Sequence, residues 1–281
     1  MNVNTTYTQS TLCRPFQTLD IQFEEELNLA WYIMHPKPRP CCTLELVHEI
    51  QQWFSMLVRD PIAQSIRYIA LASDVPGIFN LGGDLDYFIR LIRNRDNASL
   101  LRYAEDCIDT LLLNHHGLHR DITTMALAQG DCLGGGLEYA LSSDVFIAEK
   151  SARMGFPDIL FNMFPGIGAF SLLARKIGAS AAEHIITGGK VYTAEEMFDM
   201  GVVDVLAEDG QGEKAIHDFI AKEQRAANGY CMFRKAKKLT CPLTRQELMD
   251  VAEIWVEAAM NVREKDIRMM QRLIKRQSVR T

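Results

Sequence analysis

Two short apolar segments, joined by a run of three glycines and a short helix, constrain the fold of this chain most strongly. Residues 123–129 and 145–149 are predicted strands, and residues 136–142 between them are predicted to be helical. Alternation of strand, helix and strand is typical of α/β proteins, whose crossover connections are right-handed. The sequence therefore predicts an α/β fold in which residues 128–168 hold a central place.

The remaining elements follow from hydrophobic periodicity and capping residues. A hairpin is predicted from residues 19–24 and 29–35, a helix after the cap Thr43, a buried strand at 67–73 and helices over 85–113 with a break near 94–97. Further helices are predicted at 169–177, 179–186, after the cap Thr193, at 213–228 and over 244–277, with a strand at 202–206. We expect a core domain of residues 18–208 and a C-terminal helical region of residues 209–281.

Composition excludes several classes of function. The 281 residues are 48% hydrophobic and carry a formal charge of -6, which argues against a general nucleic-acid binder because phosphate neutralisation needs a basic face. The seven cysteines are odd in number and form no C-x-x-C pair, so neither a disulfide framework nor a zinc site is predicted. The first residues resemble no signal peptide, and no apolar run has the length of a membrane span. We expect a cytoplasmic protein.

No metal or cofactor is predicted. His115 and His119 have the spacing of a metal pair on a helix, but Gly117 lies between them and no third ligand accompanies them. Imidazoles near the carbonyls of a helix C-terminus are the favoured interpretation. The glycine run lacks the G-x-G-x-x-G spacing of a dinucleotide fingerprint, and the chain has no G-K-[ST] phosphate loop.

Two acids and the glycine run are the candidates for chemistry. Gly134, Gly135 and Gly136 precede a helix, where outward-pointing amides favour a developing anion, although close helix–strand packing would also require glycine. Glu138 lies in the first turn, where an acid also complements the helix dipole. Asp158 follows Pro157 among apolar residues, so it fits either a general acid–base group of raised pKa or the cap of a helix starting near residue 159.

Several motifs together resemble the crotonase (enoyl-CoA hydratase/isomerase) superfamily, and within it the diffusible-signal-factor synthases most closely. The resemblance covers residues 18–280 and rests on VPGIFNLGGDL at 75–85, the GGGLE run at 134–138, GFPD at 155–158, LFNMFPGIGA at 160–169, AEE…GVV at 194–203 and EIWV at 253–256. It implies a core of repeated ββα units with a C-terminal helical region, assembled as a homotrimer or a dimer of trimers.

The resemblance also implies roles for individual residues. Gly83 and Gly135 match the two backbone donors of an oxyanion hole for a thioester, and Glu138 and Asp158 match the two catalytic acids. Glutamate is expected at the second acid position, so Asp158 is a departure that shortens the reach by one methylene. The substrate-binding candidates are Gly82, Gly136, Ile167 and Trp255. Ordinary core packing explains the last two equally well.

The implied reaction is dehydration of a long-chain 3-hydroxyacyl thioester on acyl carrier protein to the cis-2-enoyl thioester, followed by hydrolysis to a free fatty acid signal for quorum sensing. Neither acid is assigned as base or proton donor. Carrier protein is acidic, so basic residues at 234–238 and 272–276 are candidate docking patches, each also explained as a solvated helix face. A sensor kinase is a second expected partner. The alternatives are an enoyl-CoA hydratase, isomerase or thioesterase acting on acyl-CoA, and a non-catalytic partner-binding protein of the same fold.

Overall fold

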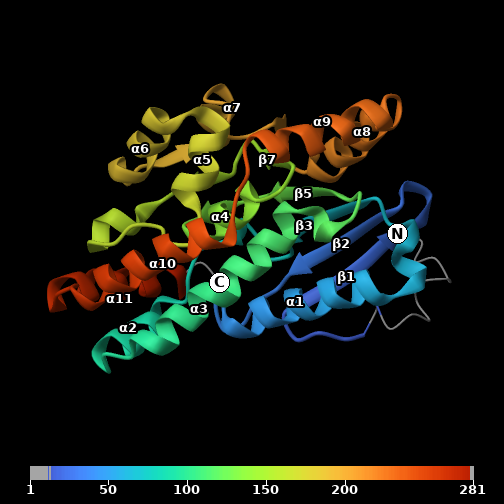
Figure 1. Cartoon of the computed structure of the whole chain (residues 1–281). Coiled ribbons are helices and arrows are strands. Elements are labelled where there is room, and N and C mark those ends of the chain that lie inside the picture. The colour runs from blue at the N-terminus through green and yellow to red at the C-terminus, as the bar shows by residue number, and fades with distance from the viewer. Residues whose placement is uncertain (1–11, 13, 279–281) are drawn as a thin grey trace.

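Two β-sheets form the centre of the protein in the computed structural model, which describes Leu12 and residues 14–278 (Figure 1). The larger sheet contains, in spatial order, β1 (Leu19–Glu24), β2 (Leu29–Met34), β3 (Tyr68–Ser73), β5 (Thr123–Ala128), β7 (Val145–Glu149) and β10 (Val205–Ala207). β1 and β2 are antiparallel, and every other neighbouring pair in this sheet is parallel. The predicted α/β class and the predicted N-terminal hairpin are therefore confirmed.

A smaller sheet carries four three-residue strands, of which the sequence pattern predicted none. Its spatial order is β4 (Ile78–Asn80), β6 (Asp131–Leu133), β8 (Arg153–Gly155) and β9 (Val191–Thr193). β4, β6 and β8 run parallel, and β9 is antiparallel to β8. Three residues are too few to show the alternation by which a strand is recognised, so these strands are defined only by their partners.

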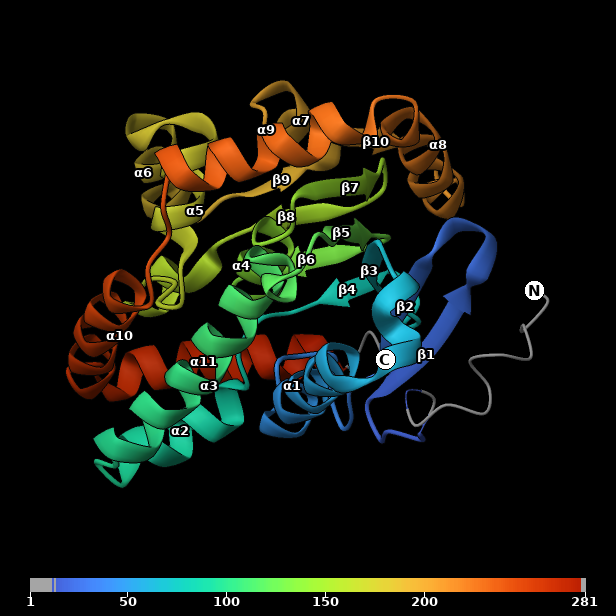
Figure 2. The ribbon, with the colours of Figure 1, turned by 45° about the vertical axis from the view of Figure 1, so that its right-hand side comes forward.

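Helices cover both sheets (Figures 1 and 2). They are α1 (Leu44–Arg59), α2 (Leu85–Arg93), α3 (Asn97–His115), α4 (Gly135–Leu141), α5 (Ala169–Ile177), α6 (Ala179–Gly188), α7 (Ala194–Asp199), α8 (Gly212–Gln224), α9 (Ala227–Thr240), α10 (Arg245–Met260) and α11 (Glu264–Ser278). Thr43 caps α1 by accepting from the amide of Leu46, and Thr193 with Glu196 forms a capping box on α7, as the sequence predicted.

The C-terminal part differs from the prediction in two ways. α9 was not predicted, and the expected single helix over 244–277 is two helices separated at residues 261–263. α10 packs on α3 and α11 packs on α2, so these two C-terminal helices lie against the helices that follow β4 (Figure 2). The boundary near residues 208–212 stays a prediction.

Both faces of the larger sheet are buried. Ala30 and Tyr32 of β2 face the main core beneath α1 and α3, whereas Leu29 and Trp31 face the other side. There they pack in a second cluster with Ile220 and other apolar residues of α8. Burial on both faces explains why the parallel strands read as continuous apolar runs rather than alternating ones. In the described residues, no helix is long and apolar enough to cross a bilayer.

Candidate active site

The predicted site residues follow three neighbouring parallel strands of the smaller sheet. Gly83 comes three residues after β4, Gly135 and Glu138 come after β6, and Asp158 comes three residues after β8. The register pairs Asn80 with Cys132 and Leu133 with Gly155. Because parallel strands place their carboxyl ends at one edge of a sheet, these residues from distant parts of the chain lie together.

The backbone nitrogens of two glycines lie close together where the turn after β4 meets the start of α4. A Cβ atom added to Gly135 would lie 3.6 Å from the nitrogen of Gly83, and one added to Gly82 would lie 3.2 Å from the nitrogen of Gly135. Gly82 also has a positive φ of 93°, which favours glycine. Within the described residues neither the Gly83 nor the Gly135 amide donates to another protein group. Two unpaired amides this close together can form a site suited to an oxyanion.

Asn80 contacts both the turn after β4 and the start of α4, a role that no motif in the sequence predicted. Its side-chain oxygen accepts from the amide of Gly82 at 2.9 Å and from the thiol of Cys42 at 3.3 Å. A Cβ atom on Gly136 would lie 2.6 Å from the carbonyl oxygen of Asn80, so α4 approaches β4 as closely as glycine allows. Gly136 therefore serves close packing, one of the two roles that the glycine run left open.

Glu138 is buried in the first turn of α4, with 2% of its surface exposed. Its Oε1 atom accepts hydrogen bonds from the amides of Ile167 and Ala169, each at 2.9 Å. Burial, and then the nearby negative charge of Asp158, raise the pKa of Glu138 to about 8, although the two amides favour the ionised form. The carboxyl group is thus held firmly in place and protonated at neutral pH.

Asp158 lies inside the short 3-10 turn Pro157–Phe161 and caps no helix, so the structural alternative predicted for it is wrong. Its Oδ2 atom is shielded from solvent and has no hydrogen-bond partner in the described residues. This atom lies 3.6 Å from the position of a Cβ atom on Gly134, at the start of the turn into α4. Burial raises the pKa of Asp158 to about 6, which leaves it mostly ionised at neutral pH.

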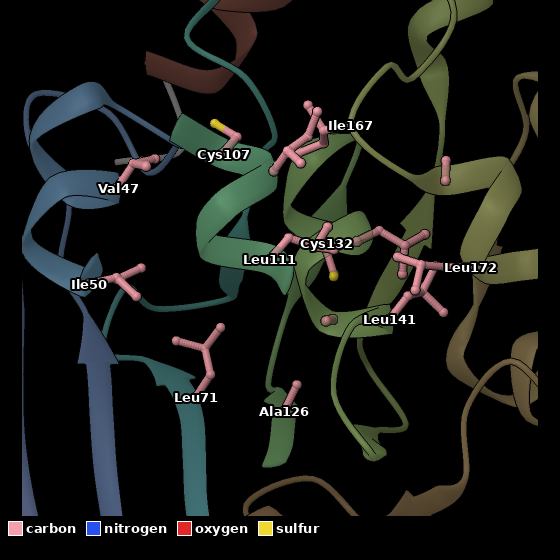
Figure 3. Close-up of a cluster of buried hydrophobic side chains, with 14 of the residues drawn as sticks. Val47, Ile50, Leu71, Cys107, Leu111, Ala126, Cys132, Leu141, Ile167 and Leu172 are labelled. Carbon is pink, nitrogen blue, oxygen red and sulfur yellow. The ribbon is translucent and has the colours of Figure 1, made fainter. Parts of the chain in front are cut away.

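An apolar cavity adjoins the glycine amides. It is lined by Gly135, Gly136 and Ile167 together with Val47, Ile50 and Leu71. Figure 3 shows these three side chains on α1 and β3, across the core from Ile167. The cavity measures about 20 Å³, enough for one water molecule. Ile167 thus lines the apolar cavity, and its backbone amide also donates a hydrogen bond to Glu138 that the sequence did not predict.

A second apolar cavity lies beside Asp158. It is lined by Phe88 of α2, Phe161, Trp255 of α10 and Met270 of α11. Trp255 packs edge-to-face on Phe88 at 5.2 Å between ring centroids, and it covers Gly166 so closely that a Cβ atom there would lie 2.2 Å from the indole ring. Trp255 therefore lines a cavity together with Asp158, and this cavity is not lined by Gly83 or Gly135.

The other predicted features lie elsewhere. His115 ends α3 and His119 follows in a separate turn, and the described residues contain no cluster of side chains able to hold a metal ion. In the patch at 234–238, Arg234, Lys235 and Lys238 are engaged by Glu223, Asp121 and Asp144. In the patch at 272–276, Arg272 and Lys275 are exposed and form no ion pair within the described residues, and the side chain of Arg276 lies outside them.

Comparisons with known proteins agree with this geometry. The family model described as enoyl-CoA hydratase/isomerase matches residues 32–277. The chain is 29% identical over 206 residues to the probable mitochondrial enoyl-CoA hydratase 2 of Arabidopsis thaliana, covering 72% of this chain and 64% of that protein. It is 31% identical over 153 residues to human mitochondrial methylglutaconyl-CoA hydratase, covering 54% of this chain and 43% of that protein. The chain thus spans less than two thirds of the length of either relative.

Solved structures share the fold at low sequence identity. The human mitochondrial delta3-delta2-enoyl-CoA isomerase superposes with a TM-score of 0.77 and 18% identity, covering 92% of this chain and 98% of that one. DspI of Pseudomonas aeruginosa superposes with a TM-score of 0.66 and 20% identity, covering 95% and 91%. Fold and family model agree over nearly the whole chain, which therefore belongs to the enoyl-CoA hydratase/isomerase family and has the crotonase fold.

Proposed function

We propose that this protein dehydrates a long-chain 3-hydroxyacyl thioester and then hydrolyses the product, as the diffusible-signal-factor synthases it resembles in sequence do. One observation carries the proposal: two buried carboxyl groups of unequal pKa lie at the same sheet edge as two unpaired amides. Burial raises the pKa of Glu138 to about 8 and that of Asp158 to about 6, so the pair holds one proton at neutral pH. Such a pair offers one proton donor and one proton acceptor.

In the dehydration step the thioester oxygen accepts hydrogen bonds from the amides of Gly83 and Gly135. The carboxylate of Asp158 removes a proton from C2, and the electron pair forms the C2–C3 double bond by way of the enolate. The C3–O bond breaks, and the carboxyl proton of Glu138 passes to the departing hydroxyl group, which leaves as water. The step ends with Asp158 protonated and Glu138 ionised.

That reversed protonation state is the one that hydrolysis needs. Glu138 now removes a proton from a water molecule that attacks the thioester carbonyl carbon, and the oxyanion again forms between Gly83 and Gly135. The C–S bond breaks, and the proton on Asp158 passes to the sulfur of the leaving thiol. The free cis-2-enoic acid is released, and both carboxyl groups return to their starting states, so one cycle needs no external proton carrier.

The acyl chain is proposed to lie in the apolar space beside Ile167. This cavity, at about 20 Å³, is far smaller than a long acyl chain. Entry of the chain therefore requires α1 and α3, which bound the cavity, to separate from each other. The apolar character of Val47, Ile50 and Leu71 suits a hydrocarbon chain once the space opens.

The thioester is proposed to arrive on acyl carrier protein, which is acidic. Arg272 and Lys275 of α11 are its proposed contacts, because both are exposed and unpaired within the described residues. α11 also supplies Met270 to the cavity beside Asp158, so this surface adjoins the site. A homotrimer or a dimer of trimers, and a sensor-kinase partner, are further parts of the proposal.

The test uses purified protein with 3-hydroxydodecanoyl groups on carrier protein and on coenzyme A, followed by mass spectrometry of the products. We expect free cis-2-dodecenoic acid from the carrier-bound substrate, and none from Glu138→Ala. Glu195→Ala, which removes an exposed acid of α7, serves as the matched control and keeps full activity. If neither the wild type nor Glu138→Ala formed product, both the proposed dehydratase activity and the proposed hydrolase activity would be contradicted.

A second candidate is reversible hydration of a 2-enoyl-CoA without hydrolysis. The matching family model and the hydratase names of two relatives favour it. The same pair of acids would catalyse the dehydration step in either direction. Formation of 3-hydroxyacyl-CoA from 2-enoyl-CoA, with no free acid released from either carrier, would select this candidate.

A further inference from the structure

A second kind of cavity lies at the end of the larger sheet opposite the candidate active site. It has a volume of about 600 Å³ and opens between the first residues of β2, β3 and β5 and the helix α9. Tyr68, the first residue of β3, lines it, whereas Leu71, nearer the other end of the same strand, lines the small cavity beside Gly135. The two cavities have no lining residue in common, so this cavity is separate from the one at the candidate active site.

The wall of this cavity, which we name the basic pocket, carries an excess of positive charge. Its cations are Arg67, Arg120, Arg234, Lys235 and Lys238, and its acids are Asp121 and Glu223. Both acids already have partners. Glu223 accepts two hydrogen bonds from Arg234, at 2.6 and 2.9 Å, and Asp121 pairs with Lys235 at 2.7 Å.

Arg67 and Arg120 are the two cations of the basic pocket without a carboxylate partner in the described residues. Arg120 donates to the carbonyl oxygens of Leu57 and Ala63 at 2.9 and 2.8 Å, and Arg67 donates to that of Gln64 at 2.7 Å. Burial, and then the positive charge of Arg67, lower the pKa of Arg120, so the two guanidinium groups lie near enough to repel each other. Each keeps N–H donors that no protein group uses.

We propose that the basic pocket binds a diphosphate group, held by Arg67 and Arg120 together. Planar guanidinium groups bind phosphate oxygens through paired hydrogen bonds, and a ligand of two or more negative charges would relieve the repulsion between them. The volume lies within the range of small-molecule sites, so the diphosphate can be free or part of a nucleotide.

The bound anion would also hold α9 in place. None of the residues of α9 is buried, and ion pairs from Arg234, Lys235 and Lys238 attach it to the rest of the protein. In Figure 2 this helix lies at the top of the molecule, on the outside of the sheets. A ligand between Arg67, Arg120 and the basic side chains of α9 adds contacts that the free protein lacks. Amide hydrogens of residues 227–240 should then exchange more slowly.

Isothermal titration of the full chain with inorganic pyrophosphate and with ADP, at about 0.15 M salt to screen non-specific binding, tests the proposal. We expect saturable binding of at least one of them, slower amide exchange at residues 227–240, and at least tenfold weaker binding by Arg67→Gln. Lys214→Gln, at an exposed position of α8 outside the basic pocket, is the matched control and should bind as the wild type does.

The two ligands distinguish the sources of the diphosphate. Tighter binding of ADP identifies a nucleotide, and equal or tighter binding of pyrophosphate identifies the free anion. Arg120→Lys keeps the charge but loses the paired donors, so it should weaken binding while leaving the circular dichroism spectrum unchanged. Absence of saturable binding of both ligands, or wild-type affinity in Arg67→Gln, would overturn the proposal.

Discussion

The nitrogen of Gly83 lies 3.6 Å from the position that a Cβ atom on Gly135 would take. This is ordinary van der Waals contact, so Gly135→Ala fits without displacing the backbone. The added methyl group would nevertheless lie next to the Gly83 nitrogen, close to where the thioester oxygen is proposed to sit. We expect a melting temperature close to that of the wild type and a loss of about 10²–10³ in kcat.

Gly136→Ala is the informative comparison for that variant. Its Cβ atom would lie 2.6 Å from the carbonyl oxygen of Asn80, so the backbone must shift and the protein should lose stability. Thermal unfolding followed by circular dichroism, together with steady-state kinetics, separates the two effects. A strongly destabilised Gly135→Ala, or one with full activity, would contradict the proposed oxyanion site.

Glu138→Gln should stabilise the protein at high pH. Burial raises the pKa of Glu138 to about 8, whereas the group titrates near 4.3 in an unfolded chain, so the folded state binds more protons between these values. The free energy of unfolding of the wild type therefore falls as the pH rises from about 4 to about 8. Glutamine carries no such dependence, and its oxygen can still accept from the amides of Ile167 and Ala169.

Urea unfolding at pH 5 and pH 8 measures this effect. We expect the excess stability of Glu138→Gln over the wild type to be about 1 kcal/mol at pH 5 and to grow to about 4–5 kcal/mol at pH 8. Glu195→Gln, at an exposed position, controls for the loss of one negative charge. A variant less stable than the wild type at pH 8 would show that Glu138 is better stabilised as an anion than its burial implies.

Asp158→Asn should abolish proton removal from C2, because the amide is no base. We expect a rate loss of about 10²–10⁴ with carrier-bound substrate. Asp158→Glu keeps the charge and adds one methylene of reach, and the unpartnered Oδ2 atom shows no hydrogen bond that this change would break. Its rate should stay within about tenfold of the wild type. If Asp158→Glu lost activity as fully as Asp158→Asn, the reaction would require a carboxylate at the shorter reach of aspartate.

Asn80→Ala should slow the reaction without removing either acid or either glycine amide. The side chain fixes the amide of Gly82 at 2.9 Å, and its loss frees the turn that aims the Gly83 amide. We expect kcat to fall by about tenfold or more and KM to change little, since a displacement of about 1 Å can cost a hundredfold. Rescue by Asn80→Asp, whose oxygen can accept the same bond, would distinguish positioning from general loss of packing.

Local sequence signals predicted the elements that depend on local physics. The hairpin, the cap at Thr43 and the capping box at Thr193 need only neighbouring residues, and all three are present. The smaller sheet could not be predicted, because its strands of three residues acquire their identity from partners far along the chain. α9 was missed because its basic surface lacks the apolar stripe by which a packed helix is recognised.

The site residues likewise include some that the sequence indicated and others that only the structure shows. The spacing of the glycines and acids indicated the types of group, and the resemblance assigned their roles, which stay predictions. The two amides that hold Glu138 come from Ile167 and Ala169, and backbone donors leave no trace in the identity of a residue. Likewise, the sequence does not distinguish Asn80 from any other polar residue at the end of a strand, and only the structure shows its hydrogen bond with the Gly82 amide.

The order of β4, β6 and β8 also limits how much of a substrate the candidate active site can contact. Their ends carry, in turn, Gly83, then Gly135 with Glu138, then Asp158. Neighbouring strands lie about 4.8 Å apart, so the three ends span only about 10 Å, which accommodates a thioester group and its first several carbons. The reacting end of a substrate is therefore the same for every chain length. Under the proposed function, discrimination among acyl chains would arise beyond these strands, where the proposed separation of α1 and α3 admits the rest of the chain.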